Sequence, residues 1–444
     1  MNWVATLLIV SLLTSPPSTF VDTSWDGFLG GRHGIAAGGA NLPLEWSPES
    51  RLWAVAVPGY GQSSPVVHAG KIFLTTTEGP EKDQYHVLCL NPENGEQEWK
   101  TSIKNSAPFK NSVYVSRAAP TPVVDDQGVY TFFESGDVLA CSLTGEVLWQ
   151  KNLSEMYGPI QAEFGLAASP CHDEGHLFIL VEQEEGSNYL VALDKKSGDA
   201  AWKQDREARS SWTSPVMVEV DGEAQIVVSS KGSIEGYRPS DGKLLWTFDQ
   251  VDGNTGTTPV DVGKGRFLQG ASGGRGEPSP LAKESNGLMQ IQKIENGFEL
   301  KRLWVAEDAS VSWASPVAHD GYAYWVNRVG VLQCYDMETG ESVYQERLPE
   351  SCWATPLPAG DHLYFFGKTG QVGVVKAGPV FDLVAENTTW NKDEIVEAEL
   401  AEETDEQRRA SAAMFGGPVL YGYAVMKDRL IMRIGNQVFC VGSR

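Results

Sequence analysis

Three tryptophans stand three residues before a proline: Trp212, Trp313 and Trp353. Four basic residues lie in or beside turns that contain glycine: Lys231, Arg328, Lys368 and Arg433. Flat aromatic faces and cations are the groups with which proteins hold anionic or aromatic molecules. If the fold brings these seven side chains to one place, they predict capture of a small anionic or aromatic ligand.

Groups that could support catalysis or bind a metal have no comparable pattern. His172 and His176 are four residues apart, but the segment Cys171–His176 reads as a strand and a turn, so the two rings would not share a helix face. We find no cluster of acidic and amide residues with the spacing of a calcium site. We therefore expect no catalytic residue, no metal site and no resident cofactor.

The elements that must position these residues follow from a repeat. A small residue followed by proline and a short apolar run occurs eight times, at Ser64-Pro65, Thr121-Pro122, Ser169-Pro170, Ser214-Pro215, Thr258-Pro259, Ser315-Pro316, Thr355-Pro356 and Gly417-Pro418. A second pattern, a glycine four residues before an aromatic residue, follows most of them, as in Gly95…Trp99 and Gly340…Tyr344. Two linked patterns with a period of about 40–60 residues indicate a repeat architecture.

One repeat can be read as four short strands. Between residues 214 and 248, alternating apolar positions are interrupted by Asp221-Gly222, Lys231-Gly232 and Asp241-Gly242, which are typical hairpin turns. Four antiparallel strands at this period predict a blade of a β-propeller, and eight repeats predict eight blades. The last repeat has only three strands after Pro418. The segment 51–57 can supply the fourth, so strands from the two ends of the chain would close the ring.

In a propeller, the connection that enters the innermost strand and the turn between the second and third strands lie on one face. The three tryptophans and four basic residues would then surround one mouth of the central channel. The alternative is that the tryptophans cap contacts between neighbouring repeats and bind nothing.

Charge and the N-terminus restrict the partners. The chain has 444 residues and a formal net charge of −23, which argues against binding nucleic acid or an anionic membrane surface. Residues 1–20 contain a short apolar run that suits a secretory signal and leaves no membrane span after its removal. We expect one propeller domain over 21–444, with an acidic and possibly helical insert at about 386–415. That insert is either solvated decoration or a docking element for a basic partner.

The six cysteines are not expected to pair. Cys89, Cys141, Cys334 and Cys440 occupy one equivalent place in four repeats, where blade three has Ala192. Equivalent positions in different repeats seldom come within bridging distance. We expect all six to be free and mostly buried.

The turn-to-tryptophan pattern resembles the tryptophan-docking motif of pyrroloquinoline-quinone-like propellers. In that family the indole packs on the neighbouring blade and joins the ring. The residues that carry the resemblance are Trp99, Trp149, Trp202, Trp246, Trp304 and Tyr344. The glycine-rich segment Trp25–Gly34 is also similar to the leading segment of exported bacterial members.

This resemblance implies a periplasmic or secreted protein of the bacterial cell envelope. Its non-catalytic relatives include the propeller subunit of the outer-membrane protein assembly machine, so a scaffold that recognises an envelope protein or small ligand is the expected function. The alternative is a pyrroloquinoline-quinone-dependent oxidoreductase of alcohols or sugars. Adjacent cysteines, which such enzymes carry over the quinone, are missing from the sequence.

Overall fold

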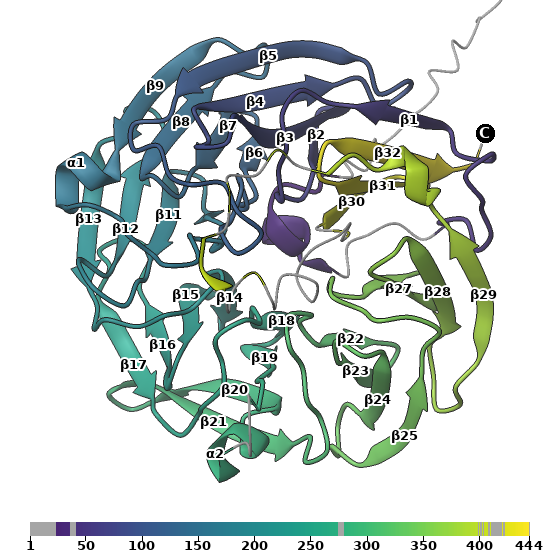
Figure 1. Cartoon of the computed structure of the whole chain (residues 1–444). Coiled ribbons are helices and arrows are strands. Elements are labelled where there is room, and N and C mark those ends of the chain that lie inside the picture. The colour runs from purple at the N-terminus through teal and green to yellow at the C-terminus, as the bar shows by residue number, and fades with distance from the viewer. Residues whose placement is uncertain are drawn as a thin grey trace, which may run out of the picture.

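The computed structural model describes residues 24–35, 41–273, 279–397, 399, 402, 404–406, 409, 420 and 422–443. Its strands form eight four-stranded antiparallel sheets. These sheets follow one another around a ring as blades, each with an innermost strand near the axis and an outermost strand at the rim (Figure 1). The eight-bladed β-propeller predicted from the repeats is confirmed.

Each blade uses consecutive strands, except the last. Blades one to four are β2–β5 (Val66–His68, Lys71–Glu78, Gln84–Leu90, Gln97–Lys104), β6–β9 (Val123–Asp125, Gly128–Phe132, Asp137–Cys141, Val147–Asn152), β10–β13 (Cys171–His172, His176–Val181, Tyr189–Asp194, Ala200–Asp205) and β14–β17 (Val216–Val220, Glu223–Ser230, Ser233–Tyr237, Leu244–Phe248). Blades five to eight are β18–β21 (Val260–Gly263, Arg266–Gln269, Gly287–Ile294, Gly297–Val305), β22–β25 (Val317–His319, Tyr322–Val326, Val331–Asp336, Ser342–Arg347), β26–β29 (Leu357–Ala359, His362–Phe366, Gln371–Lys376, Leu383–Thr388) and β30–β32 (Gly422–Met426, Arg429–Ile434, Gln437–Gly442) with β1 (Trp53–Ala56).

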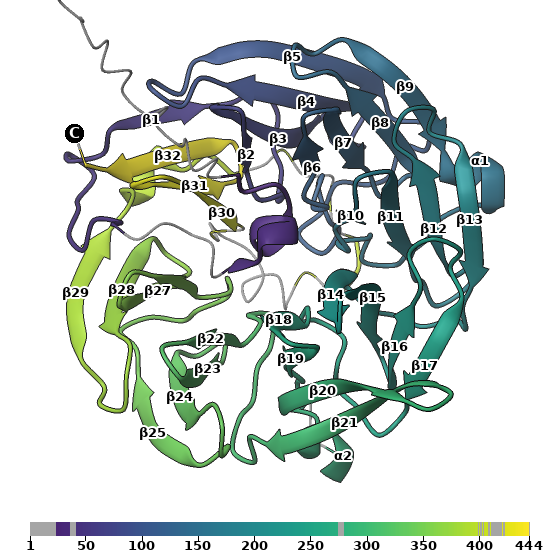
Figure 2. The same ribbon diagram turned by 180° about the vertical axis from the view of Figure 1, so that it is seen from behind.

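The eighth blade is closed by strands from both ends of the chain. β1 is its outermost strand and pairs antiparallel with β32, with Trp53 opposite Cys440. The two strands lie side by side when the ring is viewed from either side (Figure 2). The predicted closure is confirmed. The motif Gly417-Pro418 that would begin this blade lies outside the described residues, as do residues 1–20, where the secretory signal is predicted.

The hydroxyl residue before each proline links one blade to the next. The backbone N–H of Ser64 donates to Oγ1 of Thr121 at 3.0 Å, and the N–H of Thr121 donates to Oγ of Ser169 at 2.9 Å. The same bond, at 2.9–3.0 Å, joins Ser169 to Ser214, Ser214 to Thr258, Thr258 to Ser315 and Ser315 to Thr355. We call these seven residues the hydroxyl belt. The belt explains why the repeat keeps serine or threonine before proline.

Removing one belt hydroxyl should have a measurable cost. In Thr258→Val the buried N–H of Ser214 loses its acceptor, and we expect the free energy of unfolding to fall by about 1–3 kcal/mol. Thr258→Ser keeps the oxygen and serves as the matched control. Urea unfolding of the two variants is the measurement, and equal stabilities would show that the belt bond does not contribute.

Indole side chains make a second set of contacts between blades. The Nε1–H groups of Trp99, Trp149 and Trp202 donate to backbone carbonyls in the next blade, at Leu143 (3.1 Å), Lys195 (2.7 Å) and Pro239 (2.7 Å). Trp304 makes the same bond to Met337, and so does Trp53, which the sequence reading did not single out, to Pro92. We propose that these indoles hold the blades in register.

The glycine of the turn motif makes room for the indole. Gly242 has a φ of 70°, and a Cβ there would lie 2.4 Å from the ring of Trp202. A side chain at this position would therefore push the indole away from its carbonyl partner.

Two of the six expected docking residues differ from the others. Trp246 donates to Oε1 of Gln225 in its own blade at 2.7 Å. In blade five, β20 and β21 are joined by a hairpin in which Ile294 pairs with Gly297, in place of the glycine turn on which the other indoles dock. Tyr344 has no indole N–H and instead packs its ring edge-on against Phe381 of blade seven, with 5.9 Å between ring centroids.

An N-terminal segment occupies the centre of the ring. Trp25 forms a two-bond bridge with Val67 of blade one, and the carbonyl of Asp26 accepts from the N–H of Val124 in blade two. The chain then turns into the short 3-10 element η1 (Phe28–His33), the purple coil at the centre of Figures 1 and 2. At Gly31 the backbone adopts φ 60° and ψ −131°, and a Cβ would lie 1.9 Å from the Asp26 carboxylate. We call residues 24–35 the plug.

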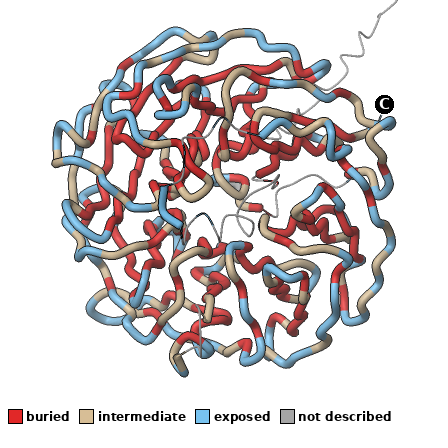
Figure 3. The backbone as a smooth tube through the Cα atoms, in the orientation of Figure 1, coloured by how far each residue is buried: buried red, intermediate tan, exposed pale blue. Residues whose placement is uncertain are grey.

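Burial follows the position of a strand in its blade. The second and third strands are mostly buried, whereas the outermost strands consist mainly of exposed and half-buried residues (Figure 3). Two short helices, α1 (Leu153–Tyr157) and α2 (Pro280–Glu284), sit in loops. Across the described residues, no helix combines the length and apolar character needed to cross a membrane.

A buried ionic cluster joins blades three and four. The guanidinium of Arg206 donates to Oε1 of Glu182 at 3.0 Å and also contacts Glu235 and Tyr237 of blade four. Both the Arg206 and Glu182 side chains are about 1% exposed. Burial raises the pKa of Glu182 above its ordinary value, against the lowering effect of Arg206.

The acidic stretch after β29 begins with an ion pair to the N-terminal region. The short 3-10 element η3 (Lys392–Glu394) places Glu394 in a two-bond contact with Arg51, at 2.7 and 2.8 Å. Further along, the carbonyl of Glu399 accepts from Asn111 at 2.8 Å. Among the described residues of the insert, η3 and residues 406 and 409 are helical, whereas residues 398, 400, 401, 403, 407, 408 and 410–415 lie outside the described part of the chain.

Candidate functional site

A cavity of about 760 Å³ lies at the centre of one face of the ring. We call this the cavity face: it carries the connections from the outermost strand of one blade to the innermost strand of the next. The lining comes from several such connections and from the plug residue Phe28. A concave site of this size that is assembled from many loops is the usual form of a ligand-binding pocket.

Aromatic side chains form much of the wall of this cavity. Phe164 and Trp212 meet edge to face, with 6.2 Å between ring centroids. Trp313, 37% exposed, lies against Trp353 with centroids 4.2 Å apart. Lys368 places its ammonium 4.7 Å from the ring centroid of Trp353, and burial lowers the pKa of this lysine.

The structure thus brings together four of the seven residues predicted for the mouth. Trp212 and Trp313 line the cavity, while Trp353 and Trp313 line a smaller hollow of about 140 Å³. Lys368 reaches this group through Trp353. Lys231 and Arg328 are exposed on their turns and are not among the lining residues.

Arg433 was expected at the rim and is instead fully buried. Its guanidinium donates to the carbonyl and hydroxyl of Ser63 at 3.0 and 2.6 Å, and to the carbonyl of Gly435. The connection between β1 and β2 passes over this side chain, and a Cβ at Gly61 would lie 2.3 Å from its Nη2 atom. Arg433 therefore joins the closing blade to blade one.

Several lining residues were missed by sequence reasoning. Six members of the hydroxyl belt line the cavity: Ser64, Thr121, Ser169, Ser214, Thr258 and Ser315. Their repetition was the signal, but it was interpreted as framework alone. Tyr114, Phe164, Glu163 and Asp405 also line the cavity and lie in connections whose sequences do not repeat. No pattern in the sequence could have found these four.

Beside the plug lies a buried set of ionisable groups. The Asp26 carboxylate accepts from the backbone N–H and Nε of Arg32, both at 2.9 Å, and lies 3.5 Å from Nε2 of His172. Nδ1 of His172 is 2.7 Å from the ammonium of Lys195, which also contacts Asp125 at 2.6 Å. Burial acts to raise the pKa of Asp26, but His172 and Arg32 outweigh it and hold that pKa at about 2. Burial lowers the pKa of His172.

These shifts make acid destabilising for the folded protein. The unfolded chain binds a proton at His172 as the pH falls through about 6.5, whereas the folded chain resists protonation until lower pH. Stability should therefore decline from pH 7 to pH 5, and the Asp26 contribution should be lost as the pH falls from 3.8 through about 2. Urea unfolding at several pH values should give a shallower decline for His172→Gln than for the native chain. A decline of the same slope would exclude His172 as a source.

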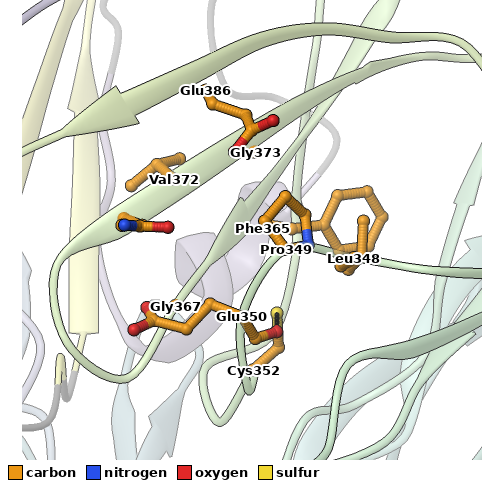
Figure 4. Close-up of a pocket in the computed structure, with 10 residues that line it drawn as sticks. Leu348, Pro349, Glu350, Cys352, Phe365, Gly367, Val372, Gly373 and Glu386 are labelled. Atoms are coloured by element: carbon orange, nitrogen blue, oxygen red, sulfur yellow. Dashed lines mark hydrogen bonds between the residues drawn. The ribbon is translucent and has the colours of Figure 1, made fainter.

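A hollow on blade seven is too small to be a site. Its volume is about 10 Å³, close to that of one water molecule, and its lining includes Glu350, Cys352 and Gly373 (Figure 4). One Glu350 oxygen accepts from the backbone N–H of Thr369 at 3.0 Å. Burial raises the pKa of Glu350 and raises the pKa of Cys352 to about 12.

The six cysteines are free, as expected, and all but Cys171 are buried. Burial raises the pKa of Cys89 to about 12 and that of Cys141 to about 11, so both remain protonated thiols near neutral pH. Within the described residues, no group of three or more histidine, cysteine or acidic side chains could hold a metal ion.

The fold and the repeat motif define the class of this protein: a pyrroloquinoline-quinone-like repeat β-propeller. A family model described as outer membrane protein assembly factor BamB matches residues 29–163, 159–273 and 294–432. Because these segments make up most of the chain, it belongs to this family.

Solved structures share the fold at low sequence identity. BamB from Moraxella catarrhalis is 13% identical, with a TM-score of 0.58 over 87% of this chain and 95% of that one. The quinohemoprotein alcohol dehydrogenase from Comamonas testosteroni is 11% identical, with a TM-score of 0.59 over 95% of this chain and 81% of that one. Among curated proteins no match is found.

Proposed function

We propose that this chain is a non-catalytic binding or scaffold propeller of the bacterial cell envelope. It recognises a protein partner or a small ligand at the cavity face. The observation that carries this proposal is the cavity itself, where aromatic side chains and hydroxyl groups from successive connections meet around Phe28 of the plug. A site of this kind can bind a ligand without any catalytic side chain.

The family supports the envelope assignment. The matched model describes an assembly factor of the outer membrane, and the N-terminal apolar run has the length of a secretory signal. Together these two observations support a periplasmic or secreted location. The acidic stretch that begins at η3 reaches the same face, since Asp405 lines the cavity. It therefore adds to the surface available to a partner.

The residues present do not fit the quinone cofactor of the oxidoreductase alternative. Pyrroloquinoline quinone carries carboxylates and needs cations around it, whereas the described residues that line the cavity include no lysine, arginine or histidine. The calcium ion that accompanies the quinone also needs clustered acidic ligands, and the described residues offer no such group. We therefore assign no catalytic step to this site.

The test is a capture experiment with the full-length chain immobilised and exposed to a native envelope fraction. Trp212→Ala/Trp313→Ala removes the aromatic wall, and Val147→Ala/Leu244→Ala changes two exposed residues on outermost strands as the matched control. We expect proteins or small molecules retained by the native chain and the control to be lost from the aromatic variant. The same set of retained molecules on all three would contradict recognition at this face.

A further inference from the structure

Five hydroxyls of the belt are both buried and open to the cavity. Each lines the cavity, is at most 4% exposed, and accepts the backbone N–H of the preceding blade through its oxygen: Thr121, Ser169, Ser214, Thr258 and Ser315. A hydroxyl has one donor hydrogen and two lone pairs. The belt bond uses one lone pair, so each group keeps a donor and an acceptor.

The remaining donors need a partner. Among the described residues, none of these five hydroxyls donates a hydrogen bond to a protein acceptor. Buried polar groups in native proteins are nearly always satisfied by protein, water or ligand. Five donor–acceptor pairs around one axis therefore point to a ligand that itself carries paired donors and acceptors.

The aromatic walls and the charge of the cavity narrow the chemical class of the ligand further. Trp212 and Trp313 offer broad aromatic surfaces that pack against C–H groups. No lysine, arginine or histidine is among the described residues that line the cavity, and this lack of cations disfavours an anionic ligand. A sugar ring has the matching features, because its faces are C–H-rich and each of its hydroxyls both donates and accepts.

We propose that the cavity binds a neutral saccharide, with its ring faces against Trp212 and Trp313 and its hydroxyls on the belt. The inference rests on the proposed function, because it names the ligand class of the same face. It replaces the anionic ligand expected from the sequence, since none of the four basic residues behind that expectation is among the residues that line the cavity.

Titration of the full-length chain tests this directly. The probes are neutral oligosaccharides of glucose and of N-acetylglucosamine, an oligomer of galacturonic acid, and pyrroloquinoline quinone, followed by calorimetry and tryptophan fluorescence. We expect a neutral oligosaccharide to bind, and to bind at least tenfold more tightly than the anionic oligomer or the quinone. Binding of neither neutral probe, or tighter binding of an anionic one, would overturn the inference.

Variants separate the site from the fold. Trp212→Ala/Trp313→Ala should weaken binding at least tenfold, and Thr258→Val severalfold, while Val147→Ala/Leu244→Ala should bind as the native chain does. Near-ultraviolet circular dichroism checks that each variant is folded, and Ser169→Ala replaces Thr258→Val if that variant is not. Equal affinity of the belt and aromatic variants with the native chain would overturn the assignment. If no saccharide binds but the cavity face still captures a partner, the proposed function stands and only the saccharide assignment fails.

Discussion

Replacing Trp25 with alanine will lower the free energy of unfolding by about 3–5 kcal/mol, the range for removing a large buried aromatic side chain. The Trp25 indole is 2% exposed and packs against Tyr423 of blade eight, with ring centroids 5.9 Å apart. Its backbone is bonded to Val67 of blade one. The substitution therefore opens a cavity at the contact between the first and last blades. Urea or thermal unfolding measures the effect.

Trp313→Ala is the matched control, because this tryptophan is 37% exposed and fills no core space. It should cost less than Trp25→Ala, because part of this ring is already exposed to water. Limited proteolysis adds a second readout, since a plug that has lost its anchor should be cleaved within residues 24–35. A Trp25→Ala chain as stable as Trp313→Ala would mean that the plug does not brace the ring.

Replacing Arg206 with methionine should lower the free energy of unfolding by a similar amount, through the loss of a buried ion pair. The change leaves the carboxylate of Glu182 buried without its ion-pair partner, with only the weaker influence of Arg209, and breaking a buried ion pair in this way costs about 3–5 kcal/mol. Arg209 still faces Glu235 at 3.2 Å, so the penalty falls mainly on Glu182. Urea unfolding at neutral pH measures this loss.

The pH dependence of this variant identifies the cause. Without Arg206 the folded-state pKa of Glu182 should rise further above its already raised value. Glu182 then takes up a proton as the pH falls, so the difference in stability between the native protein and the variant should become smaller. Glu182→Gln combined with Arg206→Met should recover part of the loss at neutral pH. A deficit that stays constant from pH 8 to pH 5 would assign it to lost packing and not to charge.

Local patterns were enough to predict the blades. The strands expected between residues 214 and 248 correspond to β14–β17. Alternation, turn residues and a fixed period are all properties of neighbouring residues. The closure by β1 and β32 is a contact between chain ends, but counting strands was sufficient to expect it.

The candidate site could not be predicted from the sequence repeat, because it depends on contacts between blades. Arg433 occupies the same repeat position as Lys231, Arg328 and Lys368, yet it is buried because the connection after β1 covers it. Trp246 has the docking motif, but its contact depends on a turn in the next blade that β20 and β21 have replaced. Phe28 of the plug and Phe164 line the same cavity although they lie far apart in the sequence. In each of these cases the contacts of the residue depend on its distance from the ring axis and on what the neighbouring blade places against it.

The pairing of β1 with β32 also sets the order in which the molecule can be completed. During synthesis β1 is the first strand of the ring to leave the ribosome, and its partner is the last. Until residues 437–442 have emerged, the blades form an open arc whose terminal edges lack their final neighbours. A premature stop shortly before these residues would remove little of the chain, yet it would leave the arc unable to close.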